Sequence, residues 1–256
     1  SSPYLCIGYH QVLESILDIE VCKALNLPIM RRWIGGGATF LDCNQIFYQC
    51  IFHNSRVPWR ADKVYQMMLN APVNVLNRIG LRGSLHAVNE VEANSLRIAG
   101  IGGGRVGEAM VVVGNLLLDF DYSLMSRVWK VPGQPFRDLA LETMEERVGT
   151  LNILDCNHTL ESLESYLTEA FAESLERPVH EAQLEREEIQ VGKNTAIELA
   201  SNEFLSLHRP SGEVKAMKSL KISANVFIHH IHLQLEGQVE EVSIRVDNGI
   251  ITDLKT

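Results

Sequence analysis

The spacing of apolar residues predicts a chain that begins with short strands and helices. The apolar runs that have strand length are residues 3–9, 29–41 and 45–52, and three glycines interrupt the second of them. Helical spacing is present at 18–27 and again at 61–79, where Pro72 predicts a kink or a new start. These alternating short elements are typical of a mixed α+β core.

Three more strand candidates follow at 84–93, 96–101 and 109–120, and the glycines between the last two predict a break in the strand pattern. A helix is predicted at 122–131, and a turn at 132–135. Later residues change in character, because 139–198 is rich in Glu, Leu and Ala at helical spacing, with Thr159 as a helix cap.

The last segment, residues 219–254, alternates apolar and polar positions as a half-buried strand does. Asp247-Asn248-Gly249 predicts a tight hairpin turn within it. We therefore predict an α+β protein with a core over residues 1–150, a helical connector at 151–210 and a small β-containing lobe at 211–256.

Composition narrows the function classes. The 256 residues carry 23 Lys and Arg against 32 Asp and Glu, and a net charge of −9 disfavours non-specific binding to nucleic acid or to a membrane surface. No apolar run approaches the roughly 20 residues of a spanning helix, and no signal-peptide pattern is visible. The five cysteines form no CxxC pair, which favours buried free thiols and a cytoplasmic protein.

Two segments combine glycines with cations. In the first, Arg31 and Arg32 precede Gly35, Gly36 and Gly37. Consecutive glycines let a ligand approach the backbone, and arginines supply forked donors for phosphate or carboxylate. An ordinary glycine-rich turn with surface arginines explains this spacing equally well.

The second segment runs from Arg97 to Arg105 and contains four glycines, at 100, 102, 103 and 104. Successive N–H groups in such a loop can form a nest for phosphate oxygens. The spacing fits neither a P-loop nor a dinucleotide fingerprint. Nearby, the carboxylates of Glu90 and Glu92 are candidates for Mg²⁺ binding, although an exposed strand edge is the commoner reason for such residues.

These segments resemble the lipoate–protein ligase family, which shares its fold with biotin–protein ligases and octanoyltransferases. Residues 31–38, followed by Asp42, are similar to the family's RRxxGGGAxxxD segment. Asn89-Glu90 stands where the family shows Asn-Asp. Residues 97–100, Arg-Ile-Ala-Gly, stand where it shows Lys-Ile-x-Gly.

The tail extends the resemblance. Lys221-Ile222 and residues 247–250 are similar to the start of the ligases' accessory domain, so that the resemblance implies a partial accessory domain and an earlier segment before residue 1. Residues 113–121 look closest to a bacterial subgroup that carries both domains on one chain. That subgroup is associated with sulfur oxidation and modifies lipoate-binding proteins similar to the glycine-cleavage H protein.

The resemblance implies a two-step reaction. Lipoate and ATP, with Mg²⁺, form lipoyl-AMP and pyrophosphate, and a lysine of an acceptor protein then takes the lipoyl group. Arg97 would be the catalytic cation, and Glu90 the metal ligand. The residues that would bind the adenylate are Arg32, Gly35, Gly36, Gly37, Ala38, Asn89, Gly100, Gly102, Gly103, Gly104 and Arg105. Apolar residues at 43–50 and 111–113 are candidates for the lipoyl pocket.

Two other functions stay open. An octanoyl or lipoyl transferase would need no ATP and would act through a lysine or a cysteine, with Cys43 and Cys50 nearest to the first glycine segment. A non-catalytic protein that binds lipoyl-AMP or a carrier is suggested by Arg97 in place of lysine. Among the histidines, His230 and His232 share one strand face without a carboxylate at useful spacing, which disfavours a metal site.

Overall fold

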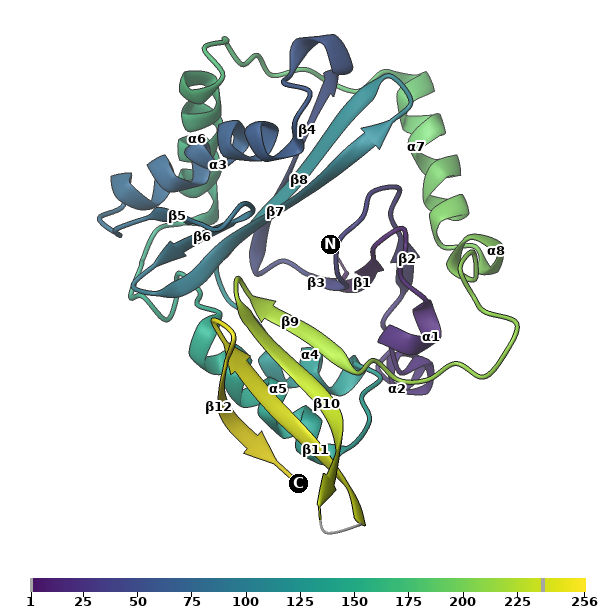
Figure 1. Cartoon of the computed structure of the whole chain (residues 1–256). Coiled ribbons are helices and arrows are strands. Elements are labelled where there is room, and N and C mark those ends of the chain that lie inside the picture. Colours follow the sequence, from purple (N-terminus) through teal and green to yellow (C-terminus); the bar gives the residue numbers. More distant parts are fainter. Residues whose placement is uncertain (1, 236–237) are drawn as a thin grey trace.

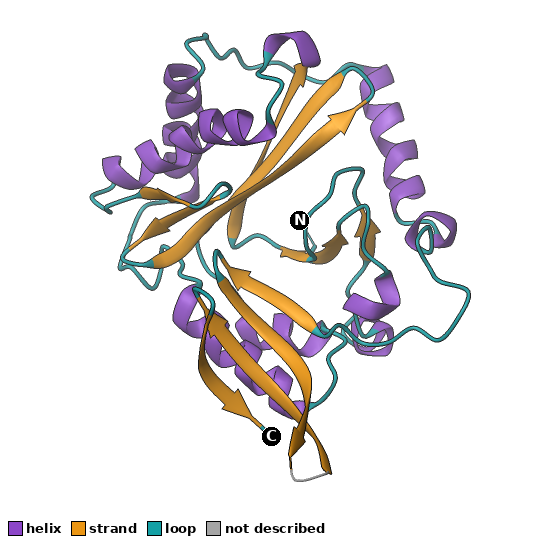
Figure 2. Ribbon diagram, in the orientation of Figure 1, coloured by secondary structure: helices purple, strands orange, loops and turns teal. Residues whose placement is uncertain are grey.

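The computed structural model describes residues 2–235 and 238–256, which form three β-sheets flanked by helices (Figures 1 and 2). The largest sheet has five antiparallel strands in the order β4-β8-β7-β6-β5. These strands are β4 (Gln45–His53), β5 (Ser84–His86), β6 (Glu90–Ala93), β7 (Leu96–Val106) and β8 (Ala109–Leu117). Together with the two smaller sheets, they confirm the predicted α+β class.

Strand β7 is longer than the sequence indicated. It passes through all the glycines from 100 to 104 without a break, since these residues pair with Val111–Asn115 of β8. The predicted interruption is therefore wrong, because pairing with β8 holds glycine-rich backbone that has a low strand propensity of its own. The predicted strand at 84–93 is instead divided into β5 and β6, and Ala87 between them has a φ of +53°.

Two helices pack with the five-stranded sheet in one hydrophobic core: α3 (Ala61–Arg78) and α6 (Leu160–Ser174). Buried residues of α3 recur at helical spacing, as at Val64, Met68 and Val75. Pro72 lies inside this single helix and is buried, so the predicted restart at that position does not occur. The Thr159 hydroxyl accepts a hydrogen bond from Ser162 N–H, which confirms the predicted cap of α6.

A three-stranded mixed sheet forms the beginning of the chain. Strand β1 (Tyr4–Ile7) lies parallel to β2 (Ile29–Arg31) and antiparallel to β3 (Thr39–Leu41). Between β1 and β2 come two short helices, α1 (Leu13–Ile16) and α2 (Ile19–Ala24). The segment between β2 and β3 is the loop that carries the first three glycines, so its position is fixed by both neighbouring strands.

The C-terminal sheet is a four-stranded antiparallel meander in the order β12-β11-β10-β9. Its strands are β9 (Ser219–Ser223), β10 (Val226–Leu235), β11 (Gln238–Asp247) and β12 (Ile250–Lys255). Asn248 and Gly249 both have positive φ, 51° and 81°, as a type I′ turn requires, so the predicted hairpin turn is confirmed.

This sheet packs on α5 (Gln134–Arg147), which follows α4 (Tyr122–Val128). Helix α5 begins inside the predicted turn, with Pro135 in its first turn. Val226 and Ile228 of β10 share one hydrophobic core with Phe136 and with Leu5 of β1. The C-terminal sheet is therefore joined to the N-terminal sheet and to α5 by a continuous apolar interior.

The connection between α6 and β9 carries α7 (Arg186–Leu199) and α8 (Asn202–Leu205) along one side of the molecule (Figure 1). Every residue of α7 is at least partly exposed, whereas Phe204 of α8 is buried. A short 3-10 turn, η1 (Asn54–Arg56), follows β4. None of the helices in the described part of the chain combines the length and apolar character needed to cross a bilayer.

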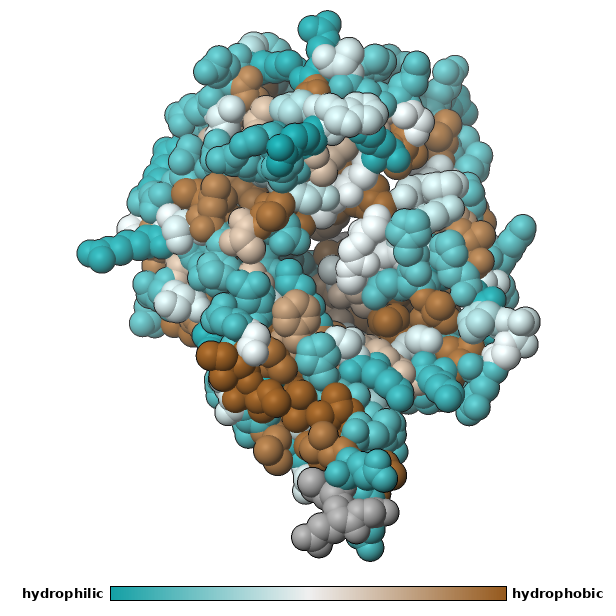
Figure 3. Space-filling view, viewed as in Figure 1, coloured by the Kyte–Doolittle hydropathy of each residue, from teal (hydrophilic) through white to brown (hydrophobic). Residues whose placement is uncertain are grey.

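Apolar side chains gather over the C-terminal strands on the face seen in Figure 3. The large apolar residues of β10, β11 and β12 that are exposed are Leu233, Val239, Ile250, Ile251 and Leu254. The same view shows a hollow near the centre of the molecule (Figure 3).

Candidate functional site

A cavity of about 250 Å³ lies where the three sheets meet α4 and α5. Its polar lining includes Gln11, Thr39, Arg97, Asn115 and Lys221. Much of the remaining lining is apolar and includes Phe40, Leu117, Met125, Trp129, Met144 and Met217. A wall of this kind fits a ligand with an aliphatic part and an anionic part.

The first glycine segment contributes directly to this cavity, through Gly37 and Ala38. The loop is folded around the Arg32 guanidinium, which donates to Gly35 O at 3.0 Å, to Gly37 O at 2.7 Å and to Cys6 O at 3.1 Å. Gly36 has a φ of +105°, and a Cβ there would stand 2.7 Å from Arg32 Nη2. Arg32 therefore shapes the loop; direct contact with an adenylate stays a prediction.

The neighbouring residue Arg31 does not line the cavity. Arg31 is fully buried and donates to five carbonyl oxygens, at distances of 2.6–3.2 Å. Two of these belong to Phe204 and Leu205 of α8, and the others to residues 8–11. Burial lowers the pKa of this guanidinium, and nearby Glu14 opposes that effect. The two arginines of the first segment are thus one loop-shaping residue and one structural residue.

Arg97 lies at the start of β7 and points toward the C-terminal sheet. Its Nη1 donates to Ile222 O at 3.2 Å, while its buried Nε has no hydrogen-bond partner. Gly100 makes room for it, because a Cβ at that position would lie 2.6 Å from Arg97 Nη2. Asn115 accepts a hydrogen bond from Gly100 N–H at 3.2 Å and donates to Gln45 at 3.1 Å. The predicted catalytic cation is therefore inside the cavity.

Glu90 is 2% exposed, and both of its oxygens have partners in the C-terminal sheet. Oε2 accepts from Ala224 N–H at 2.7 Å, and Oε1 lies 3.1 Å from Lys221 Nζ. An ammonium beside it and a backbone N–H bond do not fit the predicted Mg²⁺ ligand, since a cation would have to displace both. Asn89 is half-buried and donates to Ile101 O at 3.4 Å.

The second glycine segment does not form the predicted phosphate nest, because it is strand rather than loop. Gly104 nevertheless faces the first segment: a Cβ there would lie 3.5 Å from Ile34 Cγ2. Arg105 is remote from the cavity lining; it hydrogen-bonds to Asn54 and stacks over Trp59 at 4.5 Å. Gly102, Gly103 and Arg105 are thus placed apart from Arg97 along the same strand.

None of the five cysteines, all within the described residues, lines the cavity. Burial raises the pKa values of Cys22 and Cys50 to about 11, and burial also raises that of Cys6 despite the nearby Arg32. Cys43 is exposed. The candidate pocket residues at 43–50 and 111–113 are also absent from the lining, which includes residues of α4, α5 and β9 that the sequence did not indicate.

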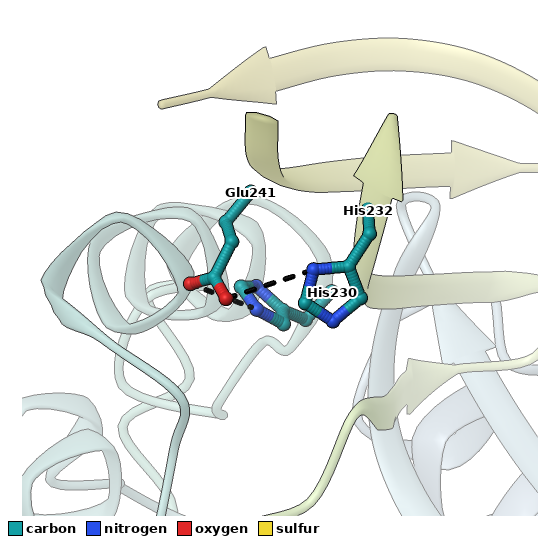
Figure 4. A group of neighbouring side chains, drawn as sticks. All are labelled: His230, His232 and Glu241. Atoms are coloured by element: carbon teal, nitrogen blue, oxygen red, sulfur yellow. Dashed lines mark ion pairs between the residues drawn. The ribbon is translucent and has the colours of Figure 1, made fainter. Parts of the chain in front are cut away.

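His230 and His232 do share one face of β10, as predicted, but the neighbouring strand adds a carboxylate (Figure 4). Glu241 lies 3.7 Å from His230 Nε2 and 3.6 Å from His232 Nδ1. The sequence could not show this carboxylate, because it depends on the β10–β11 register. Lys218 Nζ stands 3.5 Å from His232 Nε2, and its positive charge opposes a metal ion there.

A wider depression of about 420 Å³ lies between α3 and α6. The ion pair of Arg78 with Glu169 crosses it, and Arg78 also stacks over Tyr166 at 4.0 Å. It contains none of the glycine segments, so we place the functional site in the smaller cavity.

The sequence also matches a known protein family and several known proteins. The family described as Lipoyl protein ligase A/B catalytic domain matches residues 1–172. Lipoate-protein ligase A subunit 1 of Thermoplasma acidophilum is 27% identical over 180 residues, 66% of this chain and 67% of that protein. Octanoyltransferase LipM of Clostridioides difficile is 24% identical over 222 residues, 78% of this chain and 82% of that protein.

Solved structures show the same fold. A bi-partite lipoate protein ligase from Thermoplasma acidophilum, studied with its E2 lipoyl domain, superposes with a TM-score of 0.74 at 23% identity and covers 83% of this chain and 84% of its own. A lipoate-protein ligase A bound with ATP superposes with a TM-score of 0.68 at 22% identity, with 80% and 83% covered. Because the family match spans two thirds of the sequence, the chain belongs to the lipoyl protein ligase A/B catalytic domain family.

Proposed function

We propose that this protein is an ATP-dependent lipoate–protein ligase. The observation that carries the proposal is the cavity itself, which brings Gly37-Ala38-Thr39, Arg97 and an apolar wall together. The backbone and the guanidinium suit the anionic part of an acyl-adenylate, and the apolar wall suits its aliphatic chain. A relative of the same fold is described with bound ATP, and another with bound lipoic acid.

In the first step, a lipoate carboxylate oxygen bonds to the α-phosphorus of ATP. The bond from that phosphorus to the bridging oxygen breaks, and pyrophosphate leaves with the electron pair. In the second step, a neutral lysine amine of the acceptor attacks the acyl carbon, AMP leaves, and the amine loses a proton to water. Both steps need charge neutralisation and positioning rather than a protein nucleophile, and Arg97 and the glycine loop supply these.

Mg²⁺ would accompany ATP as a counterion. The residues around Glu90 do not fit as its ligands, so we derive no step through the metal. Titration of ATP binding with Mg²⁺ in Glu90→Gln would test the sequence prediction that Glu90 is a metal ligand.

The decisive experiment measures lipoate-dependent exchange of labelled pyrophosphate into ATP. We expect exchange with lipoate, MgATP and purified protein, and transfer to an acceptor once one is added. A complete lack of exchange, with correctly folded protein, would contradict the ligase proposal.

The alternative is an octanoyltransferase, because an octanoyltransferase is similar over more of the chain than the ligase subunit is. The cavity lining argues against a cysteine route in this protein, since the thiols lie elsewhere. Transfer from an octanoyl carrier protein without ATP, abolished by Cys43→Ala or Cys50→Ala, would establish the alternative. Ligand binding with neither activity would identify a non-catalytic member.

We propose a lipoyl-domain protein as acceptor. A structural relative is described together with its E2 lipoyl domain, which supports this class. The resemblance to single-chain ligases linked to sulfur oxidation favours an acceptor similar to the H protein. Parallel transfer assays with an E2 lipoyl domain and an H-type protein would separate the two, through the mass of the modified acceptor.

A further inference from the structure

We propose that Lys221 is a catalytic residue, which supplies the ammonium that the family's lysine would provide at the position of Arg97. The inference rests on the proposed ligase function and assigns a second cation to the same site. Lys221 lies on β9 of the C-terminal sheet, whereas Arg97 lies on β7 of the five-stranded sheet.

The two cations line one cavity, although they come from different sheets. Arg97 Nη1 donates at 3.2 Å to the carbonyl of Ile222, the residue next to Lys221. Gly37 of the first glycine segment lines the same space. A lysine from the C-terminal sheet is therefore brought beside the position where the family motif has lost one.

Burial and charge suit this role. Glu90 is buried, and its carboxylate holds Lys221 Nζ at 3.1 Å, while the Lys221 side chain stays 42% exposed and can be reached by a ligand. Glu90 is itself fixed by Ala224 N–H at 2.7 Å. Lys221 is paired with Glu90, whereas Arg97 is in no ion pair among the described residues, so positive charge remains for the two anionic reactants.

Lysine and arginine differ in the shape and charge distribution of the cation that they place at such a site. An ammonium is a compact point charge that can stand between a carboxylate and the α-phosphate, whereas a guanidinium is a planar fork. During adenylation, Lys221 would lie beside the attacking carboxylate and the α-phosphate oxygens. Arg97 would hold the remaining phosphate charge.

A purely structural role for Lys221, as a clamp between the sheets, makes a different prediction. Lys255 offers a matched control, because its Nζ lies 2.5 Å from Glu142 of α5 and so also ties the C-terminal sheet to the core. It does not line the cavity. If only docking matters, Lys255→Met should affect activity as Lys221→Met does.

The experiment compares lipoate-dependent pyrophosphate exchange in the full chain for wild type, Lys221→Met, Lys255→Met and the double variant Arg97→Lys/Lys221→Met. We expect Lys221→Met to lower exchange by about 100-fold or more, as loss of one transition-state cation does. Lys255→Met should stay within threefold of wild type, and Arg97→Lys should restore at least tenfold in the Lys221→Met background. Equal losses in the two methionine variants, or no restoration, would overturn the proposal.

Binding of lipoyl-sulfamoyl-adenosine, a stable mimic of the acyl-adenylate, separates this inference from the proposed function. We expect Lys221→Met to bind the mimic at least tenfold more weakly than wild type, at unchanged thermal unfolding. If wild type shows no exchange, the ligase proposal fails, and this binding comparison then decides only whether Lys221 contacts the acyl-adenylate. Equal binding of the mimic would then refute it.

Discussion

Gly100→Ala should weaken ligand binding while leaving the fold nearly unchanged. The added Cβ would stand 2.6 Å from Arg97 Nη2, whereas ordinary contact begins at 3.4 Å, so the guanidinium must move by about 0.8 Å. A shift of this size is large enough to break the 3.2 Å bond from Arg97 Nη1 to Ile222 O and to change where the guanidinium lies in the cavity. A charge-assisted hydrogen bond contributes about 1.5–3 kcal/mol, equivalent to roughly a 10- to 150-fold change in affinity.

Stability should respond weakly, because the obstructing atom is the far end of a flexible side chain. Replacing Gly with Ala also restricts the unfolded chain, which stabilises by about 0.4–1 kcal/mol. We therefore expect the free energy of unfolding to change by no more than about 1 kcal/mol. Urea unfolding measures the change in the free energy of unfolding. Calorimetric titration with lipoyl-sulfamoyl-adenosine measures the change in ligand affinity.

Gly103→Ala is the matched control on the same strand. Its Cβ would lie 2.7 Å from Val111 O, a backbone atom that cannot move without disturbing the β7–β8 pair. We expect Gly103→Ala to lose about 1–3 kcal/mol of stability. The reasoning is refuted if Gly100→Ala binds the mimic as tightly as wild type, or if it destabilises more than Gly103→Ala.

Three further outcomes are expected. Arg31→Lys should cost about 3 kcal/mol in urea unfolding, because several buried carbonyls lose their donor; a loss below about 1 kcal/mol would contradict this. Burial raises the pKa of Asp247, but hydrogen bonds from Arg245 and Arg147 outweigh it and lower the pKa below its ordinary value. The stability that this carboxylate contributes is present above about pH 4 and is lost as the pH falls. The free energy of unfolding of Asp247→Asn should therefore decrease less steeply with acidification than that of wild type. The same decrease in both proteins would be inconsistent with the pairing. Iodoacetamide at pH 8 should label Cys43 quickly and Cys50 slowly, since Cys43 is exposed and burial raises the pKa of Cys50 to about 11. Mass spectrometry measures the labelling rate of each cysteine, and equal rates would contradict this prediction.

Local chemistry explains what the sequence could predict. The turn at Asp247-Asn248-Gly249 and the cap at Thr159 depend on residues within three positions of each other. The apolar runs likewise locate most strands, since alternation or continuous burial is written along the chain. The motif segments around residues 35–38 and 97 are also local patterns, and both segments contribute residues to the cavity lining.

Long-range pairing explains what it could not predict. The glycines of β7 are held in a strand by β8, which overrides their local preference. Glu90 meets Lys221 across 131 positions, and Arg31 meets Phe204 across 173. Only the weak similarity of Lys221-Ile222 to an accessory domain pointed toward that part of the site, and nothing in the sequence placed its side chain.

The shared apolar interior of the C-terminal sheet and α5 has a consequence for how the protein could be divided. A cut in the exposed stretch between α6 and α7, residues 175–185, would leave each fragment with an uncovered apolar face, and the halves should therefore re-associate as a split enzyme. In the intact chain, residues 175–185 would then act chiefly by keeping the two halves at a high effective concentration, in the millimolar range for flexible linkers. The one-chain protein and its divided form would then differ in dilution sensitivity more than in architecture.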